Sequence, residues 1–303
     1  MIARADVKDK NLIYLYWKEL FAHDDNGSID FFFNHYWSEN NCFVLKKNGE
    51  LVSGLNVLKH DMMLNEQRLR VSFISGVFTR PQDQGKGYMT ELMTEMLDIL
   101  SHQDLITMLL AYNPKVYEPF GFSTVMNKKV VHLTRSMIPK VSTMGVTYQV
   151  SSKELLGAYQ KFTKYFTGFF VRDETYFDIM KKDLEAQNGK LVAYVENNQL
   201  MGYMMYTVSQ LHVDIQEVVY FNSDTLYRLL NFAASLKDRI DLSVSTAEDL
   251  SKLFPKALIE IKPWMMARLN DSNLFNKLFH VSVFNGQEAF MIAKKPLFNP
   301  DFQ

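Results

Sequence analysis

The stretch best suited to chemistry is a glycine loop that follows a strand-like run. Residues 73–78 are largely apolar and partly β-branched, the run ends at Pro81, and Gly85-Lys86-Gly87 then opens a segment with apolar residues at helical spacing. Glycines let a backbone approach a ligand closely, and the first N–H groups and the dipole of a helix attract anions. The pattern therefore predicts an anion site, above all for a phosphate, and Lys86 adds a cation to it.

Two other phosphate-binding motifs fit this loop poorly. A Walker loop needs Ser or Thr after the Gly-Lys pair, where Gly87 stands, and a dinucleotide fingerprint needs a third glycine, where Thr90 stands. A Walker or Rossmann site is therefore not expected. The alternative to an anion site is a plain surface turn between a strand and a helix.

The loop lies within a regular series of predicted elements. Apolar residues recur at helical spacing in two early segments, and the pair Asn48-Gly49 is a strong signal for a hairpin between two strands. The sequence predicts helices at 11–22, 28–37 and 89–100, and strands at 42–46, 51–59, 67–79, 105–112 and 122–133.

The loop and a later segment together resemble the GCN5-related N-acetyltransferase superfamily. Its acetyl-CoA loop has Arg or Gln, two residues, Gly, one residue, and Gly or Ala, after a proline that ends a strand. Here Gln84 opens the same pattern after Pro81, with Met89 in place of the small residue. Tyr117 stands four residues before a Gly-Phe pair, as in the superfamily. The resemblance implies that acetyl-CoA is bound by Val77, Phe78, Thr79, Gln84, Gly85, Lys86, Gly87, Tyr88 and Asn113.

The order of elements recurs in the second half of the chain. The turn that corresponds to the glycine loop, at 220–225, has no glycine and gains Asp224, which would cap a helix and repel a pyrophosphate. The second copy is therefore not expected to bind CoA. Its predicted strands lie at 146–150, 190–196, 203–208 and 216–221, with one helix after Ser152 and another at 226–236.

Two acetyltransferase-like units, of which only the first is intact, resemble the Eis (enhanced intracellular survival) family. Eis-like chains continue into a sterol-carrier-like domain through a Trp-containing segment that ends in Arg-Leu-x-Asp. Residues 264–271 look similar, and the sequence ends 32 residues after Asp271, so this third domain would be shortened. We therefore expect an α/β (α+β) fold with two tandem mixed-sheet units flanked by helices. The expected domains are a catalytic unit at 1–139, a degenerate unit at 140–262 and a short C-terminal segment at 263–303.

Acetyl transfer from a thioester to an amine needs a held cofactor, a neutral amine and a proton for the leaving thiolate. The resemblance implies that Tyr117 is the general acid, since a phenol near the sulfur can protonate the thiolate. It also implies that the base is the C-terminal carboxylate, here that of Gln303. Acidic alternatives for the base are Asp24, Asp25, Asp30 and Glu118.

The sequence therefore predicts an acetyl-CoA-dependent N-acetyltransferase that acts on a primary amine in a ternary complex. The acceptor would be an aminoglycoside-like or polyamine-like molecule, or a protein lysine. The aromatic segment 28–37 either packs in a core or, as the resemblance suggests, forms a wall of the acceptor pocket. The alternative is a non-catalytic CoA-binding protein with a regulatory or assembly role, although such a protein has no need of a leaving-group acid.

The bulk composition limits the remaining possibilities. The length of 303 residues suits about two domains, and 47% hydrophobic residues can fill sizeable cores. A net charge of −1 gives no reason to expect nucleic acid or a membrane as a partner, and no apolar run approaches the roughly 18 residues of a membrane span. The single cysteine, Cys42, excludes an internal disulfide, and the seven histidines form no metal-ligand spacing. We therefore expect a cytoplasmic protein without a metal, and the resemblance implies a homo-oligomer.

Overall fold

A mixed β-sheet connects the two halves of the chain in the computed structural model, which describes residues 2–23, 25–298 and 300–301. Its strands are β1 (Ile2–Arg4), β2 (Cys42–Lys47), β3 (Glu50–Leu64), β4 (Gln67–Thr79), β5 (Ile106–Leu110), β6 (Ser123–Thr134), β7 (Val146–Thr147), β8 (Phe169–Phe170), β9 (Gly189–Glu196), β10 (Gln199–Val208), β11 (His212–Tyr220), β12 (Arg239–Ser245) and β13 (Leu258–Leu269). Among the described residues their order is β1-β2-β3-β4-β5-β13-β6-β12-β11-β10-β9-β7, and β8 pairs with β3.

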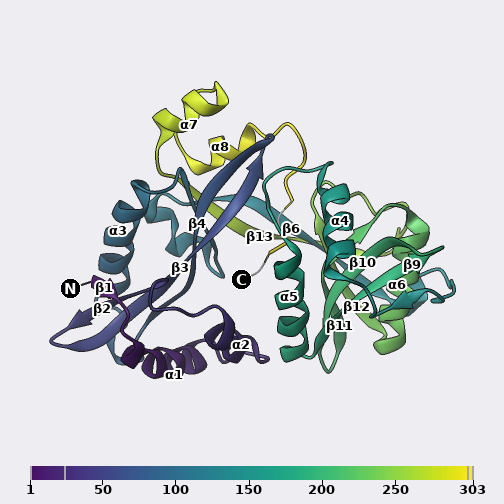
Figure 1. Cartoon of the computed structure of the whole chain (residues 1–303), viewed down its shortest axis with the longest axis horizontal. Coiled ribbons are helices and arrows are strands. Elements are labelled where there is room, and N and C mark those ends of the chain that lie inside the picture. The colour runs from purple at the N-terminus through teal and green to yellow at the C-terminus, as the bar shows by residue number, and fades with distance from the viewer. Residues whose placement is uncertain (1, 24, 299, 302–303) are drawn as a thin grey trace.

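Helices flank this sheet in both halves (Figure 1). They are α1 (Lys10–Leu20), α2 (Ser28–His35), α3 (Tyr88–Ser101), α4 (Ser152–Thr163), α5 (Glu174–Ala186), α6 (Ser223–Leu236), α7 (Ser272–Phe279) and α8 (Gly286–Met291). The expectation of a mixed α/β fold with two tandem units is confirmed.

The first unit is an antiparallel meander, β2-β3-β4, followed by α3 and by β5, which is parallel to β4. Asn48 and Gly49 form the predicted hairpin turn, with φ values of 52° and 84°. The helix α3 lies against the sheet because one of its faces is apolar. The buried residues of that face are Leu92, Met93, Met96, Leu97 and Leu100.

The second unit repeats this order. The strands β9, β10 and β11 form an antiparallel meander, and α6 connects β11 to the parallel strand β12. Asn197 and Asn198 take positive φ in the turn between β9 and β10, which is the place of Asn48 and Gly49 in the first unit. Two helices, α4 and α5, precede β9, whereas the sequence pattern predicted only one.

The last strands of the two units are exchanged. β6, from the first half of the chain, pairs with β12 of the second unit, and β13, from the second half, lies between β5 and β6. We expected residues 122–133 to close the first sheet, but β13 is the neighbour of β5 instead. The predicted boundary at 262–263 falls inside β13. Each half therefore completes its sheet only with a strand from the other.

The C-terminal segment crosses from the first unit to the second. The short helices α7 and α8 lie at one end of the first half (Figure 1), and α8 packs closely enough that a Cβ on Gly286 would lie 2.2 Å from the Ala267 carbonyl oxygen. The described residues 296–298 and 300–301, which we call the tail, then reach the second unit. There the Thr167 N–H donates to the Pro296 carbonyl at 2.9 Å, and the Phe298 N–H donates to the Thr167 carbonyl at 3.0 Å.

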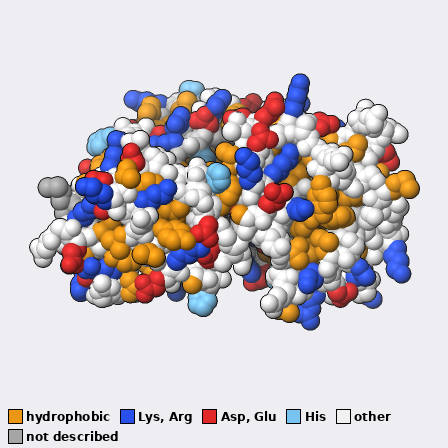
Figure 2. All heavy atoms as spheres, turned by 60° about the horizontal axis from the view of Figure 1, so that its bottom comes forward, with side chains coloured by type: hydrophobic (Ala, Val, Ile, Leu, Met, Phe, Trp, Pro, Cys, Tyr) orange, Lys and Arg blue, Asp and Glu red, His pale blue; other side chains and the backbone are white. Residues whose placement is uncertain are grey.

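Within the part of the chain that the structure describes, no helix is both long and apolar enough to cross a membrane. On the face in Figure 2, lysine and arginine side chains are interspersed with aspartate and glutamate, and neither sign forms a broad patch. This face therefore offers no broad surface of a single charge sign.

Candidate active site

The two central strands of the first unit separate at a defined point. β4 and β5 pair only as far as Ile74 and Leu109. A β-bulge then follows, because Ser75 pairs with Asn56 and Phe78 pairs with Gly54, so Gly76 and Val77 lie opposite a single residue of β3. No described strand pairs with β4 on its β5 side beyond Ile74. An extended ligand could add to that open edge.

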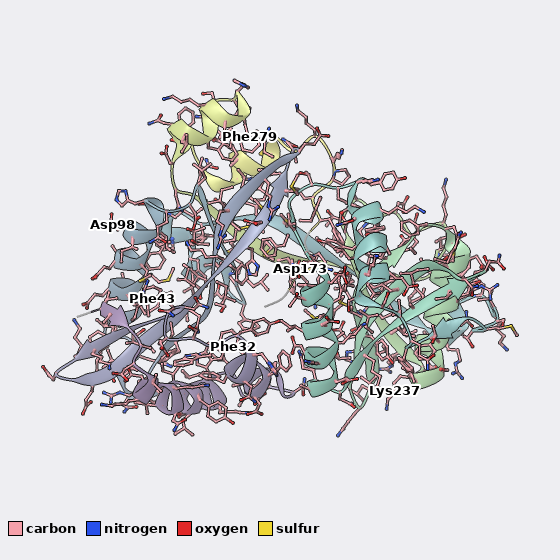
Figure 3. All side chains as sticks on the ribbon, in the orientation of Figure 1. Phe32, Phe43, Asp98, Asp173, Lys237 and Phe279 are labelled. Atoms are coloured by element: carbon pink, nitrogen blue, oxygen red, sulfur yellow. The ribbon has the colours of Figure 1, made fainter. Side chains whose placement is uncertain are left out.

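A tryptophan from α1 covers the bulge. A Cβ placed on Gly76 would lie 1.7 Å from the Trp17 ring, and φ at Gly76 is +56°, so only glycine fits here. Trp17 stacks in turn on Phe32 of α2, with ring centroids 4.7 Å apart. Phe32, labelled in Figure 3, lies between α2 and the strands of the first unit. The early aromatic helices therefore pack beside the point where β4 and β5 separate.

The glycine loop presents the start of α3 to solvent. Gly85 and Gly87 have φ values of 76° and 80°, and a Cβ on either would meet no atom within 4 Å. Gly87 is the N-cap of α3, and no side chain caps this helix. Its first N–H groups are thus left for another acceptor, and a helix N-terminus of this kind favours an anion. Backbone conformation rather than tight packing is what requires glycine at these two positions.

Charged side chains brace the turn before the loop. The buried carboxylate of Asp83 accepts from Lys86 Nζ at 2.7 Å and from Arg80 Nε, and Arg80 also pairs with Glu50 at 2.9 Å. The hydrogen bonds from Lys86 and Arg80 hold the pKa of Asp83 below its ordinary value. Lys86 is therefore engaged within the turn, and the backbone N–H groups are the main donors that the loop offers. Gln84 reaches back toward the Thr79 carbonyl at 3.5 Å.

Tyr117 lies between two short 3₁₀ turns, Pro114–Val116 and Glu118–Phe120. Its ring packs edge-on against Phe122 at 6.2 Å, and burial raises the pKa of its phenol. The group therefore carries its proton throughout the neutral range. Asn113 has a local task, since its side-chain oxygen accepts from the Lys115 N–H at 3.2 Å.

Several of the predicted site residues meet around one hydrophobic cluster. Val77 of the bulge, Tyr88 at the start of α3 and Tyr117 all pack against the cluster that contains Ile74, Leu109 and Phe122. Phe78 and Thr79 serve the sheet as well: the Phe78 ring is buried against Gly54, and the Thr79 hydroxyl lies 3.1 Å from the Ser53 hydroxyl. The bulge, the helix start and the tyrosine are thus neighbours, although they come from three separate segments.

A cavity of about 850 Å³ opens where β4 and β5 separate. Ser75 and Gly76 from β4 and Leu110 from β5 form its floor, and α1 and α2 supply an aromatic wall. The aromatic residues of that wall are Trp17, Phe21, Phe31, Phe32 and Tyr36. The remaining wall is polar and comes from α5, β11 and β12 of the second unit, together with the exchanged strands β6 and β13. Its residues are Lys128, Asp183, Gln187, His212, Asp214, Gln216, Asp241, Ser243 and Lys262.

The predicted bases are engaged elsewhere or fall outside the described residues. Gln303 and Asp24 are among the residues that the structure does not describe. Asp25 and Asp30 each pair with Lys18 at 2.6 Å, and Asp25 also accepts from the Gly27 N–H at the start of α2. Glu118 is exposed in the first turn of a 3₁₀ helix. The role of Gln303 therefore stays a prediction.

The second unit differs from the first at the start of its helix and at the point where its two central strands separate. Asn222 caps α6, because its side-chain oxygen accepts from the Thr225 N–H at 2.8 Å, and Asp224 pairs with Arg228 at 2.7 Å. β11 and β12 pair only from 212 to 215 and from 239 to 242. Beyond that point the tail lies against both strands, and the Ser245 hydroxyl donates to the Leu297 carbonyl at 2.9 Å.

The polar residues that line the cavity were not predicted as site residues from the sequence. The signal that could have revealed it is the alternation of His212, Asp214 and Gln216 along β11, which places three polar side chains on one face of a strand. A group of three or more His, Cys, Asp or Glu side chains that could hold a metal ion is absent from the described residues.

Two family models match the chain, both described as acetyltransferase (GNAT) domains. One matches residues 2–125 and the other residues 168–269, so the matches fall on the two units separately. No curated protein matches the sequence.

Solved structures extend the likeness over most of the chain. A GCN5-related N-acetyltransferase from Anabaena variabilis ATCC 29413 is similar with a TM-score of 0.75 and 17% identity, covering 89% of this chain and 73% of the other. Eis1 from Mycobacterium abscessus is similar with a TM-score of 0.65 and 16% identity, covering 91% and 75%. A GCN5-related N-acetyltransferase from Kribbella flavida has a TM-score of 0.68 and 15% identity, covering 89% and 70%. At such identities the likeness concerns the fold.

Proposed function

Because the chain belongs to the GCN5-related N-acetyltransferase (GNAT) superfamily, we propose that its first unit binds acetyl-CoA and transfers the acetyl group directly to a primary amine in the adjoining cavity. The proposed acceptor is a small aminoglycoside-like or polyamine-like amine, or a protein lysine. The proposed cofactor contacts are Val77, Phe78, Thr79, Gln84, Gly85, Lys86, Gly87, Tyr88 and Asn113, and the proposed general acid is Tyr117.

One observation carries this proposal: the uncapped start of α3 at Gly87 lies in the same unit as the open edge of β4. A diphosphate fits the first, since free N–H groups and the helix dipole point at it. An extended amide-containing arm fits the second, since it can pair with the β4 backbone like an added strand. CoA has both parts. In the second unit, by contrast, Asn222 caps the helix and the tail lies against the strands.

The chemistry then follows from the residues beside the bulge. Acetyl-CoA supplies a thioester, whose acyl carbon forms a bond to the amine nitrogen as its bond to sulfur breaks. The Val77 N–H is the proposed donor to the acyl oxygen, where negative charge develops. Tyr117 is proposed to give its proton to the leaving thiolate, and burial raises the pKa of this phenol so that it is protonated before the reaction. The amine must arrive neutral and passes its surplus proton to a base or to water.

The first test replaces Tyr117 with phenylalanine. Tyr117→Phe is expected to lower kcat by about 100-fold or more, because general acid catalysis contributes on that order, while the affinity for acetyl-CoA stays unchanged. Thiol release measures turnover, and isothermal titration measures affinity. Tyr165→Phe is the matched control, because Tyr165 is 68% exposed.

Two results would count against the proposal. Unchanged turnover of Tyr117→Phe would remove the tyrosine from the mechanism. An absence of thiol release with polyamines, aminoglycosides and lysine peptides, together with thermal stabilisation by acetyl-CoA, would favour the non-catalytic CoA-binding alternative.

A further inference from the structure

The polar wall of the cavity is a face of the central sheet. On β11 the residues His212, Asp214 and Gln216 alternate along the strand and line the cavity, and Asp241 on β12 lies directly beside Asp214 in the register. β6 adds Lys128. This face belongs to the unit that has the capped helix, so the second unit contributes to the cavity without a CoA site of its own.

Most of the charges near this wall already have partners. Asp241 accepts from His132 at 2.8 Å and lies 3.7 Å from His212, so two imidazoles surround it. Lys262 pairs with Glu260 at 2.9 Å. These groups need no ligand to balance them.

Lys128 and Asp214 differ from the paired groups because neither has a close polar partner in the described part of the chain. Both are half-buried, and neither makes a hydrogen bond or an ion pair within 4.0 Å to the described residues. The ammonium of Lys128 lies over the Trp264 ring at 4.1 Å, which is a favourable place for a cation but supplies no hydrogen-bond acceptor. Burial lowers the pKa of Lys128 and raises that of Asp214, and the attraction between the two side chains offsets these pKa shifts only in part. Each charged form is therefore disfavoured by the site, and an opposite charge from a ligand would relieve that penalty.

Two neutral groups of the same wall are also unsatisfied. The Ser243 hydroxyl and the Gln216 side-chain oxygen are buried and have no hydrogen-bond partner among the described residues. Ser243 itself is only 5% exposed. Buried polar groups of folded proteins almost always have partners, so the described residues leave this wall incompletely satisfied.

We propose that the polar wall of the cavity binds a zwitterionic α-amino-acid group, with the ligand's carboxylate at Lys128 and its ammonium at Asp214. A carboxylate alone would be repelled by Asp214, and an ammonium alone would be repelled by Lys128. A group with both charges satisfies both side chains at once.

This inference rests on the proposed acetyl transfer to a primary amine and assigns a class of primary amine that differs from the acceptors named above. When the α-ammonium is held at Asp214, the nitrogen that is acetylated must be a second, distal amine. The acceptor is then a diamino acid. Its aliphatic chain would lie along the aromatic wall of α1 and α2, and its distal amine would reach the bulge at Gly76 and Val77. A polycation suits the cavity less well, because the cations Lys128 and Lys262 also line it and would repel a further ammonium group.

The test compares three ligands that share one carbon chain. L-Lysine carries both α-groups, 1,5-diaminopentane lacks the carboxylate, and 6-aminohexanoate lacks the α-ammonium. Binding to the full chain in the presence of CoA is measured by isothermal titration, which needs no acetyl transfer. L-Lysine is expected to bind at least about tenfold more tightly than either analogue, because each analogue loses one close charge pair in a partly buried site.

Two variants test which side chain binds which charged group of the ligand. Lys128→Met should remove the preference over 1,5-diaminopentane, and Asp214→Asn should remove the preference over 6-aminohexanoate. Lys129→Met is the matched control: Lys129 is the next residue of β6 and is not among the residues that line the cavity, and its ammonium donates to the Glu248 carbonyl at 2.7 Å. This variant should keep both preferences.

The possible outcomes separate the subsite from the enzyme activity. Equal or tighter binding of 1,5-diaminopentane by the unmodified protein would overturn the proposal in favour of a polycation site, and so would a preference that survives Lys128→Met. Selective binding of L-lysine without thiol release from acetyl-CoA would support the subsite and contradict the proposed activity. Thiol release with all three ligands at equal efficiency would support the proposed acetyl transfer and contradict the amino-acid subsite.

Discussion

The first and second units carry the same strand, turn and helix, but the two segments differ in what they leave open. In the first unit, α3 starts at Gly87 with no side-chain cap, whereas in the second unit α6 starts after Asn222, whose side chain bonds to the Thr225 N–H. An open helix start can accept an anion from solvent, and a capped one has already used a donor. The nearby Asp224 adds a negative charge to the second helix start.

The strands next to these helices also differ in whether they leave space for a ligand. β4 and β5 separate beside a cavity, whereas β11 and β12 separate around the tail, where Phe298 is buried in a core cluster. Asp301 of the tail joins Arg172 and Glu217 in a buried ion network. The two units therefore share an architecture, and a few residues decide that one is open to a ligand while the chain itself fills the other. The fold alone does not specify the function.

The largest expected effect comes from breaking the network that holds the tail. Arg172 is 1% exposed at its side chain and forms two hydrogen bonds to the Glu217 carboxylate, at 2.9 and 2.7 Å. Arg172→Met leaves Glu217 and Asp301 buried without a cation, which should lower the free energy of unfolding by about 3–5 kcal/mol. Urea denaturation followed by circular dichroism measures it.

Arg68→Met serves as the control for this variant. Arg68 pairs with Asp61 of β3 and its side chain is 63% exposed, and exposed ion pairs of this kind contribute little to stability. A loss below about 1 kcal/mol for Arg172→Met would mean that the network does not anchor the tail.

The next effect concerns the open helix start. Gly87→Val places a β-branched residue at a φ of 80°, which costs about 1–3 kcal/mol or forces the loop to rearrange. The affinity for acetyl-CoA should fall roughly 30-fold, equivalent to about 2 kcal/mol. Isothermal titration with acetyl-CoA checks this value.

Lys86→Ala is the comparison for the glycine variant. The Lys86 ammonium is bound to Asp83 within the turn, so its removal should weaken binding much less than Gly87→Val. A larger loss for Lys86→Ala would mean that the side chain rather than the backbone holds the diphosphate.

The smallest effect is expected for a variant that tests whether the N-cap of α6 is the only reason why the second unit does not bind acetyl-CoA. Asn222→Gly removes the cap of α6 and should reduce stability by only a few tenths of a kcal/mol, because glycine is also tolerated at an N-cap. Acetyl-CoA should still bind to a single site per chain, since the tail remains against β11 and β12. A second site in the titration would show that the cap was the decisive difference.

Local features of the first unit were predictable from the sequence. The Asn48-Gly49 turn, the apolar face of α3 and the glycines with positive φ each depend on a few neighbouring residues. The spacing of Tyr117 from Gly121 likewise lies within a short segment, and the structure brings the tyrosine to the cluster below the loop. Short-range sterics and helical periodicity are strong enough to be visible in one sequence.

Features that depend on distant residues were not predictable. The apolar pattern of residues 122–133 predicts a strand but does not name its neighbour, and the exchange places β6 beside β12. The pairing of Asp25 and Asp30 with Lys18 spans only 7 and 12 residues, but it depends on how the loop after α1 and the start of α2 pack against α1. The second helix before β9, α5, was also missed.

By itself the sequence determined that the chain has two similar units, that the first has a glycine loop before a helix, and that the second lacks it. These properties follow from residue types at short spacing, where backbone conformation and helix capping act locally. Only the tertiary structure decided that the units exchange β6 and β13, that the tail fills the second unit, and that Lys128 and Asp214 face the cavity beside the bulge. The reason is physical: strand pairing, burial and charge compensation are set by residues far apart in the chain, which meet only when the whole sheet has formed.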